Sequence, residues 1–403
     1  MRTHSINSFP CRVLHLFHLY LPHTMNWAFR LMMDTPGTVR WVAAPWFVRN
    51  TYYTADIRPF VRPLQTALGL LPTDEWQYRR FWNLLVRAER PLAIYQKWLL
   101  KQLQVEKPDI LHAHFGPLGC DYLDLSQRLG VPLVTSFYGY DYESVPFQKP
   151  AYREKYRRLF QGAAAITCAG PYGREVLLRQ GCPPERLHIL PMSMRPAEFP
   201  FFSREKQAGA LRLVQVASFT EKKGFMDTLR AVQIALKTCP GLQLTIAGEQ
   251  SDPALVRQLR AFIRDQHLEN AVQWLDFVPH RELPAFLRPF DVFIQPSCYT
   301  RLRDCEGGPV SILEAQASGM PVISTTHFDI PQEVVDGQTG LLAPEKDPLA
   351  LARHIERFYG MDNETFQCFA RAAAAHVRAG FDVAETGRRL RGVYEGVLRT
   401  SGS

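Results

Sequence analysis

The segment that decides the fold runs from Asp291 to Leu341 and reads, in order, DVFIQPS (291–297), CYTRLRDC (298–305), EGGPVSILEA (306–315), ASGMPVISTT (317–326) and IPQEVVDGQTGL (330–341). An apolar run is followed by a polar loop, a stretch opened by Gly-Gly-Pro, and a second apolar run. This alternation is typical of a strand, a crossover helix and a parallel strand. The segment therefore predicts part of a doubly wound α/β domain.

The same rhythm extends along the rest of the chain. It predicts strands at 12–19, 39–44, 109–115, 132–138, 163–169, 186–192, 211–218, 242–248, 271–277, 291–296, 321–325 and 340–343. Helices are clearest at 227–236, 253–267, 309–318 and 348–359. The rhythm breaks at 195–209, which is rich in Pro and charged residues. We therefore expect an N-terminal domain over 1–200 and a second domain over 201–379.

Composition limits the class of protein. The 403 residues are 46% hydrophobic and 21% charged, which suits a globular protein of two or three domains. No apolar run approaches the ~18 residues of a membrane-spanning helix. The short run at 13–19 is interrupted by His and lacks a convincing cleavage site, which disfavours a signal peptide. Eight scattered cysteines without a Cys-x-x-Cys pair indicate reduced thiols. We therefore expect a cytoplasmic protein.

The net charge of +8 lies in one half of the chain. Residues 1–200 hold 24 Lys and Arg against 15 Asp and Glu, whereas the remainder holds 23 against 24. The excess favours an anionic partner, either a membrane surface or a phosphorylated acceptor. Nucleic acid is disfavoured, because there is no basic block and no zinc-finger or RNA-binding signature. The Arg-rich and aromatic stretch 75–104 would suit lipid headgroups, but we favour a helical pair that packs its aromatic side chains inward.

Several common chemistries lack their motifs. There is no G-x-G-x-x-G after a strand, no P-loop and no G-x-S-x-G, which disfavours dehydrogenases, P-loop NTPases and hydrolases. His112 and His114 alternate along a predicted strand, a spacing that suits metal ligands. No second ligand cluster accompanies them, so we expect no metal or other cofactor. A histidine at the carboxyl end of a strand, where ligands bind in such sheets, is the favoured interpretation.

The stretch from Glu306 to Glu314 carries the clearest chemistry. Gly307 and Gly308 let a backbone approach a ligand without a Cβ, and Pro309 suits the first helical position. Free N–H groups at the start of the helix would favour a phosphate. Eight residues of helix span roughly 12 Å, so the two carboxylates would contact different parts of one elongated ligand.

This pattern, Glu306-x7-Glu314 with its Gly-Gly-Pro turn, resembles the donor-site signature of the retaining family-4 glycosyltransferases. Further segments follow in the family's order: DILHAHFG (109–116), SFYGYD (136–141), VASFTEKKG (216–224), IAGE (246–249) and 330–341. The resemblance spans about residues 12–400 and is strongest from 211 onward. It is closest to bacterial enzymes that assemble exopolysaccharides and lipid-linked glycans. It implies an α/β GT-B fold of two Rossmann-like domains facing across a cleft, with a helix in 380–403 that crosses back to the N-terminal domain.

The resemblance also implies roles for individual residues. Glu306 would lie against the donor sugar, Lys223 would neutralise the departing diphosphate, and Glu314 would bind the ribose hydroxyls of a nucleotide-sugar. His114 completes the expected catalytic set with Glu306 and Lys223. The other positions expected at the donor are Gly307, Gly308, Pro309, Val310, Ser218, Gly248 and Glu249, and those expected to face the sugar or acceptor in the cleft are Tyr138 and Asp141.

The sequence departs from the family pattern at several positions. Many relatives have Arg at the position of Ser218 and His at that of Tyr138. A short Gly-Val-Asp-like motif reads Ser-Met-Arg at 193–195, and the loop 21–26 lacks glycines that many relatives have there. Two interpretations are open: an altered choice of donor, with Arg195 or the pair Arg301 and Arg303 replacing the charge missing at 218, or a weakened activity. The intact set of Glu306, Glu314 and Lys223 favours an active enzyme.

Together these features predict a glycosyltransferase that moves a hexosyl group from a nucleotide-sugar to a lipid-linked or polysaccharide acceptor with retention of configuration. The basic half would give it a peripheral contact with an anionic membrane. Two alternatives stay open. One is a catalytically degenerate GT-B scaffold or partner subunit, which the departures at Ser218 and Tyr138 motivate. The other is a nucleotide-sugar epimerase or phosphorylase on the same fold, which would need no acceptor hydroxyl.

Overall fold

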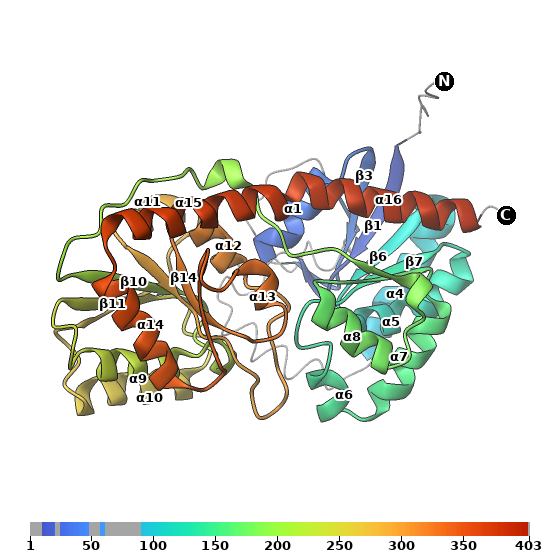
Figure 1. The fold of residues 1–403 in the computed structure, drawn as a ribbon. Coiled ribbons are helices and arrows are strands. Elements are labelled where there is room, and N and C mark those ends of the chain that lie inside the picture. Colours follow the sequence, from blue (N-terminus) through green and yellow to red (C-terminus); the bar gives the residue numbers. More distant parts are fainter. Residues whose placement is uncertain (1–9, 21–24, 48–56, 61–89, 402–403) are drawn as a thin grey trace, which may run out of the picture. The chain divides into compact units, whose positions relative to one another are not determined.

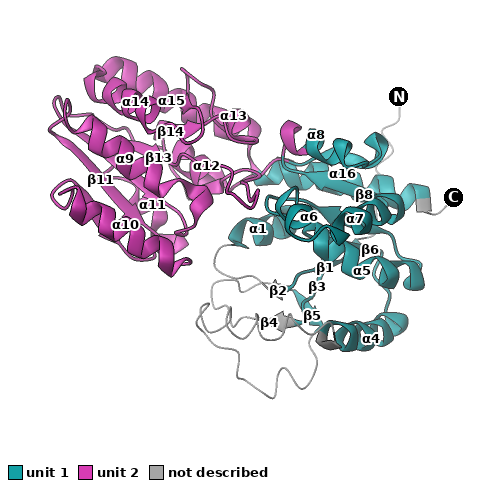
Figure 2. Ribbon diagram, turned by 90° about the horizontal axis from the view of Figure 1, so that it is seen from below, with its two compact units in different colours: residues 1–169, 174–190, 383–403 teal, residues 170–173, 191–382 magenta. Residues whose placement is uncertain are grey.

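The computed structural model describes residues 10–20, 25–47, 57–60 and 90–401 (Figure 1). The chain forms two compact units (Figure 2). Unit 1 comprises residues 1–169, 174–190 and 383–403, and unit 2 comprises 170–173 and 191–382. Each unit is built on its own parallel sheet.

Unit 1 contains a seven-stranded sheet in the order β5-β3-β1-β6-β7-β8-β9. Its strands are β1 (Cys11–Leu16), β3 (Thr38–Ala43), β5 (Arg58–Phe60), β6 (Ile110–His114), β7 (Leu133–Ser136), β8 (Ala165–Cys168) and β9 (Leu187–Ile189). Two short strands, β2 (Leu19–Tyr20) and β4 (Trp46–Phe47), pair separately. The helices are α1 (Asn26–Asp34), α4 (Arg90–Val105), α5 (Gly116–Leu129), α6 (Ser144–Gln148), α7 (Ala151–Gly162), α8 (Pro171–Arg179) and α16 (Val383–Ser401), of which α8 begins in unit 2.

Unit 2 contains a six-stranded sheet in the order β12-β11-β10-β13-β14-β15. Its strands are β10 (Leu211–Val216), β11 (Leu242–Ala247), β12 (Val272–Leu275), β13 (Val292–Ile294), β14 (Val322–Thr325) and β15 (Gly340–Ala343). Its helices are α9 (Phe225–Ala235), α10 (Pro253–Asp265), α11 (Leu283–Phe286), α12 (Val310–Ala317), α13 (Ile330–Glu333), α14 (Pro348–Gly360) and α15 (Asn363–Gly380). Helices α9, α10 and α14 cover one face of this sheet, and α11 and α12 cover the other (Figure 1).

Local sequence explains where several helices of unit 2 begin. The side chains of Asp252, Asp347 and Asp362 accept hydrogen bonds from backbone N–H groups in the first turns of α10, α14 and α15. Such caps satisfy donors that the helix itself leaves unpaired. Buried apolar residues on both faces of the sheet then form two separate cores. Strands β13 and β15 read as uninterrupted apolar runs because both of their faces are covered.

In both sheets, the order in which the chain adds neighbouring strands reverses at one internal point. In unit 1 the chain order reverses between the neighbouring strands β1 and β6, and in unit 2 between β10 and β13. In open α/β sheets, ligands bind beyond the carboxyl ends of the strands at such a reversal. The loops that follow β1, β6, β10 and β13 are therefore the places to look for a site.

The observed elements confirm most of the predicted ones. All twelve predicted strands overlap observed strands, whereas β4 and β5 were not predicted. Helix α12 begins at Val310, so Pro309 is its N-cap and not its first helical residue as predicted. Residues 75–89 of the predicted helical pair lie outside the described residues, and the rest of that stretch is α4. Within the described ranges, no helix combines the length and apolar character that crossing a bilayer requires.

The chain passes from unit 1 to unit 2 at Pro191, about ten residues before the expected boundary at 200, and returns at Val383. The reason lies in the packing of two apolar side chains. Met194 and Phe199 are fully buried in a core of unit 2, and Met194 also forms a parallel bridge with Asp382. The unpatterned stretch that suggested the boundary therefore begins inside unit 2. Helix α16, which falls in the expected terminal segment, belongs to unit 1.

Candidate active site

Two adjacent lysines lie just beyond the carboxyl end of β10. Lys222 and Lys223 belong to a short 3-10 helix, Glu221–Lys223, which ends at Gly224. Gly224 has φ of +70°, and a Cβ there would lie 2.0 Å from the carbonyl oxygen of Pro296. Only glycine fits this position. The turn thus brings the lysines against the loop that follows the neighbouring strand β13.

Glu306, at the end of that loop, forms ion pairs with both lysines. Lys223 Nζ lies 2.8 Å from Glu306 Oε2, and Lys222 Nζ lies 3.4 Å from Oε1. Lys222 also pairs with Asp304 at 3.1 Å. Burial alone would raise the pKa of Glu306, but Lys223 and Lys222 lower it to about 2. Burial likewise opposes the charge on Lys222, yet Glu306 and Asp304 raise its pKa above the ordinary value. The group is therefore ionised at neutral pH, with two cations beside one buried carboxylate.

The loop containing Ser218 is held against the loop after β11. Gly248 has φ of +156°, and a Cβ there would lie 1.8 Å from the carbonyl oxygen of Ala217. The N–H of Phe219 donates to the carbonyl oxygen of Glu249 at 2.8 Å. Ser218 and Gly248 thus lie in two packed loops at the same sheet edge as Lys223. Glu249 joins them through its backbone.

The Gly-Gly-Pro turn leads from Glu306 into α12. A Cβ on Gly308 would lie 2.5 Å from Glu333 Oε1, so glycine lets that buried carboxyl group approach the turn. Burial raises the pKa of Glu333, and the carboxylates Asp329 and Glu306 raise it further. Helix α12 carries no side-chain cap at its N-terminus. Its first N–H groups belong to Val310 and the residues that follow, and they suit an anion.

Glu314 lies one turn into α12 and has a different partner from Glu306. Its Oε1 lies 2.6 Å from His280 Nε2, and the Glu314 side chain is only 5% exposed. His280 in turn packs edge-on against the ring of Phe199, with ring centroids 5.6 Å apart. Glu306 and Glu314 therefore have different partners, which agrees with the separation that their spacing along the sequence predicted.

Among the described residues, the ion pairs of Glu306 are with Lys222 and Lys223 and with none of the arginines named for the charge missing at Ser218. Arg195 pairs with Glu198 at 3.4 Å, and Arg301 and Arg303 are exposed on the loop before Glu306. The structure places Lys222 against the carboxylate instead. Whether these arginines replace the missing charge at a bound diphosphate stays a prediction, while Lys222 is a second cation beside Glu306 that the sequence analysis did not single out.

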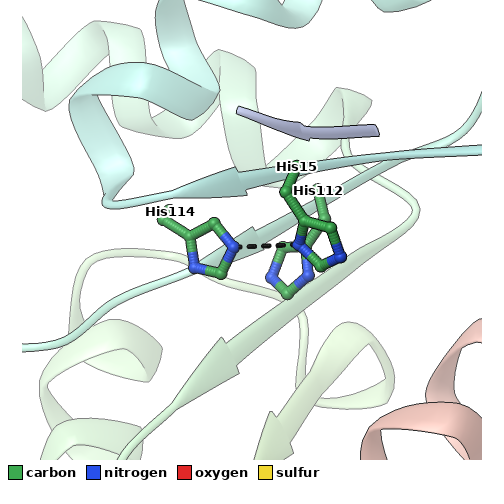
Figure 3. A group of neighbouring side chains, drawn as sticks. All are labelled: His15, His112 and His114. Atoms are coloured by element: carbon green, nitrogen blue, oxygen red, sulfur yellow. Dashed lines mark hydrogen bonds between the residues drawn. The ribbon is translucent and has the colours of Figure 1, made fainter. Parts of the chain in front are cut away.

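Unit 1 gathers three histidines at its own reversal point (Figure 3). His15 on β1 faces His112 and His114 on β6, and His15 Nδ1 lies 3.1 Å from His114 Nε2. The other nitrogen of His114 lies 2.8 Å from the Tyr138 hydroxyl. All three rings are at most 1% exposed. The sequence drew attention to the two histidines of β6 but missed His15.

The histidine cluster has the atoms for a metal site, but hydrogen bonds already use them. Burial lowers the pKa of His112 to about 3 and lowers those of His15 and His114 as well. Neutral imidazoles are the form that ligates metals. However, the two nitrogens of His112 lie 2.6 Å from the Tyr394 hydroxyl and 2.7 Å from Ser136 Oγ. A bound metal would break at least one hydrogen bond of His112, so the arrangement suits a hydrogen-bonded network better.

Asp141 does not face a cavity, because it has no exposed surface. Its carboxylate accepts hydrogen bonds from the backbone N–H groups of Gly116, Tyr138 and Gly139 at 2.8–3.0 Å. Burial raises its pKa, while these three hydrogen bonds oppose the rise. Asp141 therefore holds the loop that presents Tyr138, which is partly exposed. The expected cleft-facing role of Asp141 is wrong for this reason.

Within unit 2, the structure brings together the predicted residues that carry charge: Lys223 and Glu306 in one ion pair, and Glu314 in the helix that follows. The sequence missed their partners Lys222, His280 and His327. It also missed Glu333, which lies against Gly308, and Glu345, which binds His327. A charged or titratable residue directly after a strand was the available signal for His327 and Glu345, which follow β14 and β15. Nothing in the spacing indicated which carboxylate each would meet.

Comparison with known proteins agrees with this geometry. Residues 198–374 match the family model of "Glycosyl transferases group 1", and residues 63–195 match "Glycosyltransferase Family 4". The chain is 32% identical over 299 residues to the putative colanic acid biosynthesis glycosyltransferase WcaL of Salmonella typhimurium, covering 71% of each chain. It is 32% identical over 246 residues to the amylovoran biosynthesis glycosyltransferase AmsK of Erwinia amylovora, covering 60% of each.

A solved structure extends the match to the fold. HepE of Anabaena, in complex with UDP-glucose, superposes with a TM-score of 0.71 at 14% identity, over 96% of this chain and 99% of HepE. The two Rossmann-like units and the charged site of unit 2 therefore define a glycosyltransferase of the GT-B class. More particularly, the chain belongs to the family-4 glycosyltransferases.

Proposed function

We propose that this glycosyltransferase acts in exopolysaccharide assembly, moving a hexosyl group from a nucleotide-sugar to a lipid-linked or polysaccharide acceptor with retention of configuration. Relatives named for colanic acid and amylovoran biosynthesis support the exopolysaccharide role. The observation that carries the donor chemistry is the buried Lys223–Glu306 pair directly ahead of α12, the helix that bears Glu314.

In the proposed donor complex, Glu314 accepts hydrogen bonds from the ribose hydroxyls, and Glu306 lies against the sugar ring. The diphosphate takes the place of Glu306 as the partner of Lys223 and also meets the uncapped N-terminus of α12. As the sugar–phosphate bond breaks, negative charge grows on the leaving diphosphate. Fixed cations and backbone N–H groups stabilise such charge without rearranging. With two lysines at hand, we propose that the transfer needs no metal ion.

Retention without a placed nucleophile implies that the acceptor hydroxyl attacks from the face that the leaving phosphate occupies. The hydroxyl oxygen forms the new glycosidic bond as the bond to the diphosphate breaks, and its proton passes to a phosphate oxygen. The basic excess of residues 1–200 supports an acceptor that carries phosphate or lies at an anionic membrane surface. Tyr138, which is partly exposed, is proposed to lie toward the sugar or acceptor, and the buried His114 is proposed to act through the Tyr138 hydroxyl, which lies 2.8 Å from its Nδ1.

A transfer assay tests this function. The full chain is incubated with radiolabelled nucleotide-sugars and either a lipid extract or a polysaccharide fraction as acceptor. Label that enters the organic phase identifies a lipid-linked acceptor, and label in the polymer identifies a polysaccharide. The anomeric coupling constant of the product, measured by NMR, reports retention or inversion. Inverted product contradicts the proposed mechanism. Binding of nucleotide without transfer to any acceptor supports the scaffold instead, and turnover without an acceptor supports the epimerase.

A further inference from the structure

His327 connects three loops at the carboxyl edge of the sheet in unit 2. Its Nε2 lies 3.1 Å from the backbone N of Glu306, and its Nδ1 lies 2.7 Å from Glu345 Oε1. The second carboxylate oxygen of Glu345 accepts from the N–H of Tyr299 at 2.8 Å. The ring has no exposed surface, and the ring of Tyr299 packs against it with centroids 4.9 Å apart.

These contacts determine where the proton of His327 lies. A backbone N–H can only donate, so Nε2 must be unprotonated to accept from Glu306. The proton of the neutral ring is then on Nδ1, where it donates to the carboxylate of Glu345. Burial alone would raise the pKa of Glu345, but the hydrogen bonds from His327 and from Tyr299 lower it. An ionised Glu345 can only accept, and this fixes the tautomer.

The residue that His327 holds by its backbone is Glu306, whose side chain is expected to contact the donor sugar. Because its N–H is held, the backbone of Glu306 has a fixed position at the entrance to the Gly-Gly turn. Its Oε2 is bound by Lys223. Its Oε1 is buried and accepts no hydrogen bond from any described residue, although Lys222 Nζ lies 3.4 Å away. Oε1 is therefore an acceptor whose hydrogen-bonding capacity the described residues leave unused.

We propose that His327, held in one tautomer by Glu345, is a positioning residue that fixes Glu306 for contact with the donor sugar. This inference rests on the proposed donor function. Nucleotide binding through Glu314 and His280 uses other contacts. It does not depend on the hydrogen bonds that run from Glu345 through His327 to Glu306, which we call the relay. Loss of the relay should thus reduce the chemical step much more than it weakens binding of the nucleotide alone.

The first test needs no activity. Two-dimensional NMR of the full chain labelled with ¹⁵N-histidine, compared with His327→Gln to assign the signal, reports which ring nitrogen carries the proton. The relay predicts protonated Nδ1 and unprotonated Nε2, and Glu345→Gln should weaken the hydrogen bond at Nδ1. A proton on Nε2 would overturn the relay, whatever the protein does with nucleotides.

The second test separates positioning from a purely structural role. The probes are the nucleotide that the wild type binds, UDP, GDP or ADP, and the glucose conjugate of that nucleotide. Kd for the nucleotide and kcat with the conjugate are measured for His327→Leu, His327→Gln and Glu345→Gln. The Leu variant should lose about 100-fold in kcat, since small misplacements of a reacting group cost about that much, while Kd for the nucleotide changes less than about threefold. Gln offers an acceptor oxygen near Nε2 and should recover about tenfold.

His354→Asn is the matched control. His354 is a partly buried histidine of unit 2 whose Nε2 lies 3.1 Å from the carbonyl oxygen of Leu342, and it shares no hydrogen bond with Glu306 in the described part of the chain. Its kcat should match the wild type. Unchanged kcat in folded His327→Leu, or equal losses of nucleotide affinity and kcat, would overturn the proposal. A wild type that binds no nucleotide defeats the proposed function and the role of the relay in it, and the NMR result then stands by itself.

Discussion

Lys223 Nζ and Glu306 Oε2 lie 2.8 Å apart at the carboxyl edge of the sheet in unit 2, with side chains only 15% and 9% exposed. A charge buried to this degree is costly unless a partner offsets it. Each residue is therefore the main partner of the other until a ligand enters. In the proposed donor complex, an anionic diphosphate and a sugar hydroxyl exchange with this pair, and that proposal connects the ion pair to glycosyl transfer.

Replacing Lys223 with Met should lower kcat by about 100- to 1,000-fold, because removing one fixed charge-stabilising group commonly costs that much. Lys222 partly offsets the charge of Glu306 and so preserves the fold. The exposed Lys237 at the end of α9 provides the control, and Lys237→Met should retain full activity. Steady-state kinetics of the two variants test the claim, and equal activities would contradict it.

The Glu306 carboxylate predicts a dependence of stability on pH. Its pKa in the folded protein is about 2, against an ordinary 4.5, so its stabilising contribution is present above about pH 4.5 and is lost as the pH falls toward 2. The difference corresponds to about 3 kcal/mol. Urea unfolding at about pH 3 and at about pH 5.5 should show a larger change for the wild type than for Glu306→Gln. Identical changes in both proteins would contradict the assignment.

Gly224 should tolerate no side chain. The Cβ of Gly224→Ala would lie 2.0 Å from the backbone of Pro296 at a positive φ, and we expect a loss of at least about 3 kcal/mol. Gly360, at the end of α14, has no atom within 4 Å of an added Cβ, so Gly360→Ala should stay within about 1 kcal/mol of the wild type. Thermal unfolding compares them, and similar melting temperatures would show that the turn can move aside.

The attachment of α16 to the sheet of unit 1 involves one buried hydrogen bond. The Tyr394 hydroxyl lies 2.6 Å from His112 Nδ1, and both side chains are fully buried. Tyr394→Phe leaves the histidine nitrogen without this partner and should cost about 1–3 kcal/mol. The free energy of unfolding of the full chain measures the loss. A variant as stable as the wild type would show that another group satisfies His112.

The strands were largely predictable because of how they are buried. Runs such as Val292–Ile294 and Gly340–Ala343 are buried or nearly so on both faces, so they read as apolar segments bounded by turn residues. The edge strand Arg58–Phe60 gave no such signal, since it is short, contains Pro and is mostly exposed. Buried strands are visible in a sequence, whereas a short edge strand is not.

The site was predictable only in part, for a different reason. Glu306, Glu314 and Lys223 stood out because family motifs surround them. The contacts of Glu314 with His280 and of Glu306 with His327 join loops that follow different strands. One sequence contains no spacing that relates such loops, because the sheet order alone brings them together. The same holds for His15, which only strand pairing places beside His112.

The measurement that tests the central claim most directly is the titration of UDP, GDP and ADP into the full chain by calorimetry, with Glu314→Ala and the exposed control Glu364→Ala alongside. One nucleotide should bind the wild type and the control equally, and the loss of charged hydrogen bonds in Glu314→Ala should weaken it by at least about tenfold. No binding of any nucleotide at millimolar concentration, or equal binding by all three proteins, would contradict a donor site in unit 2.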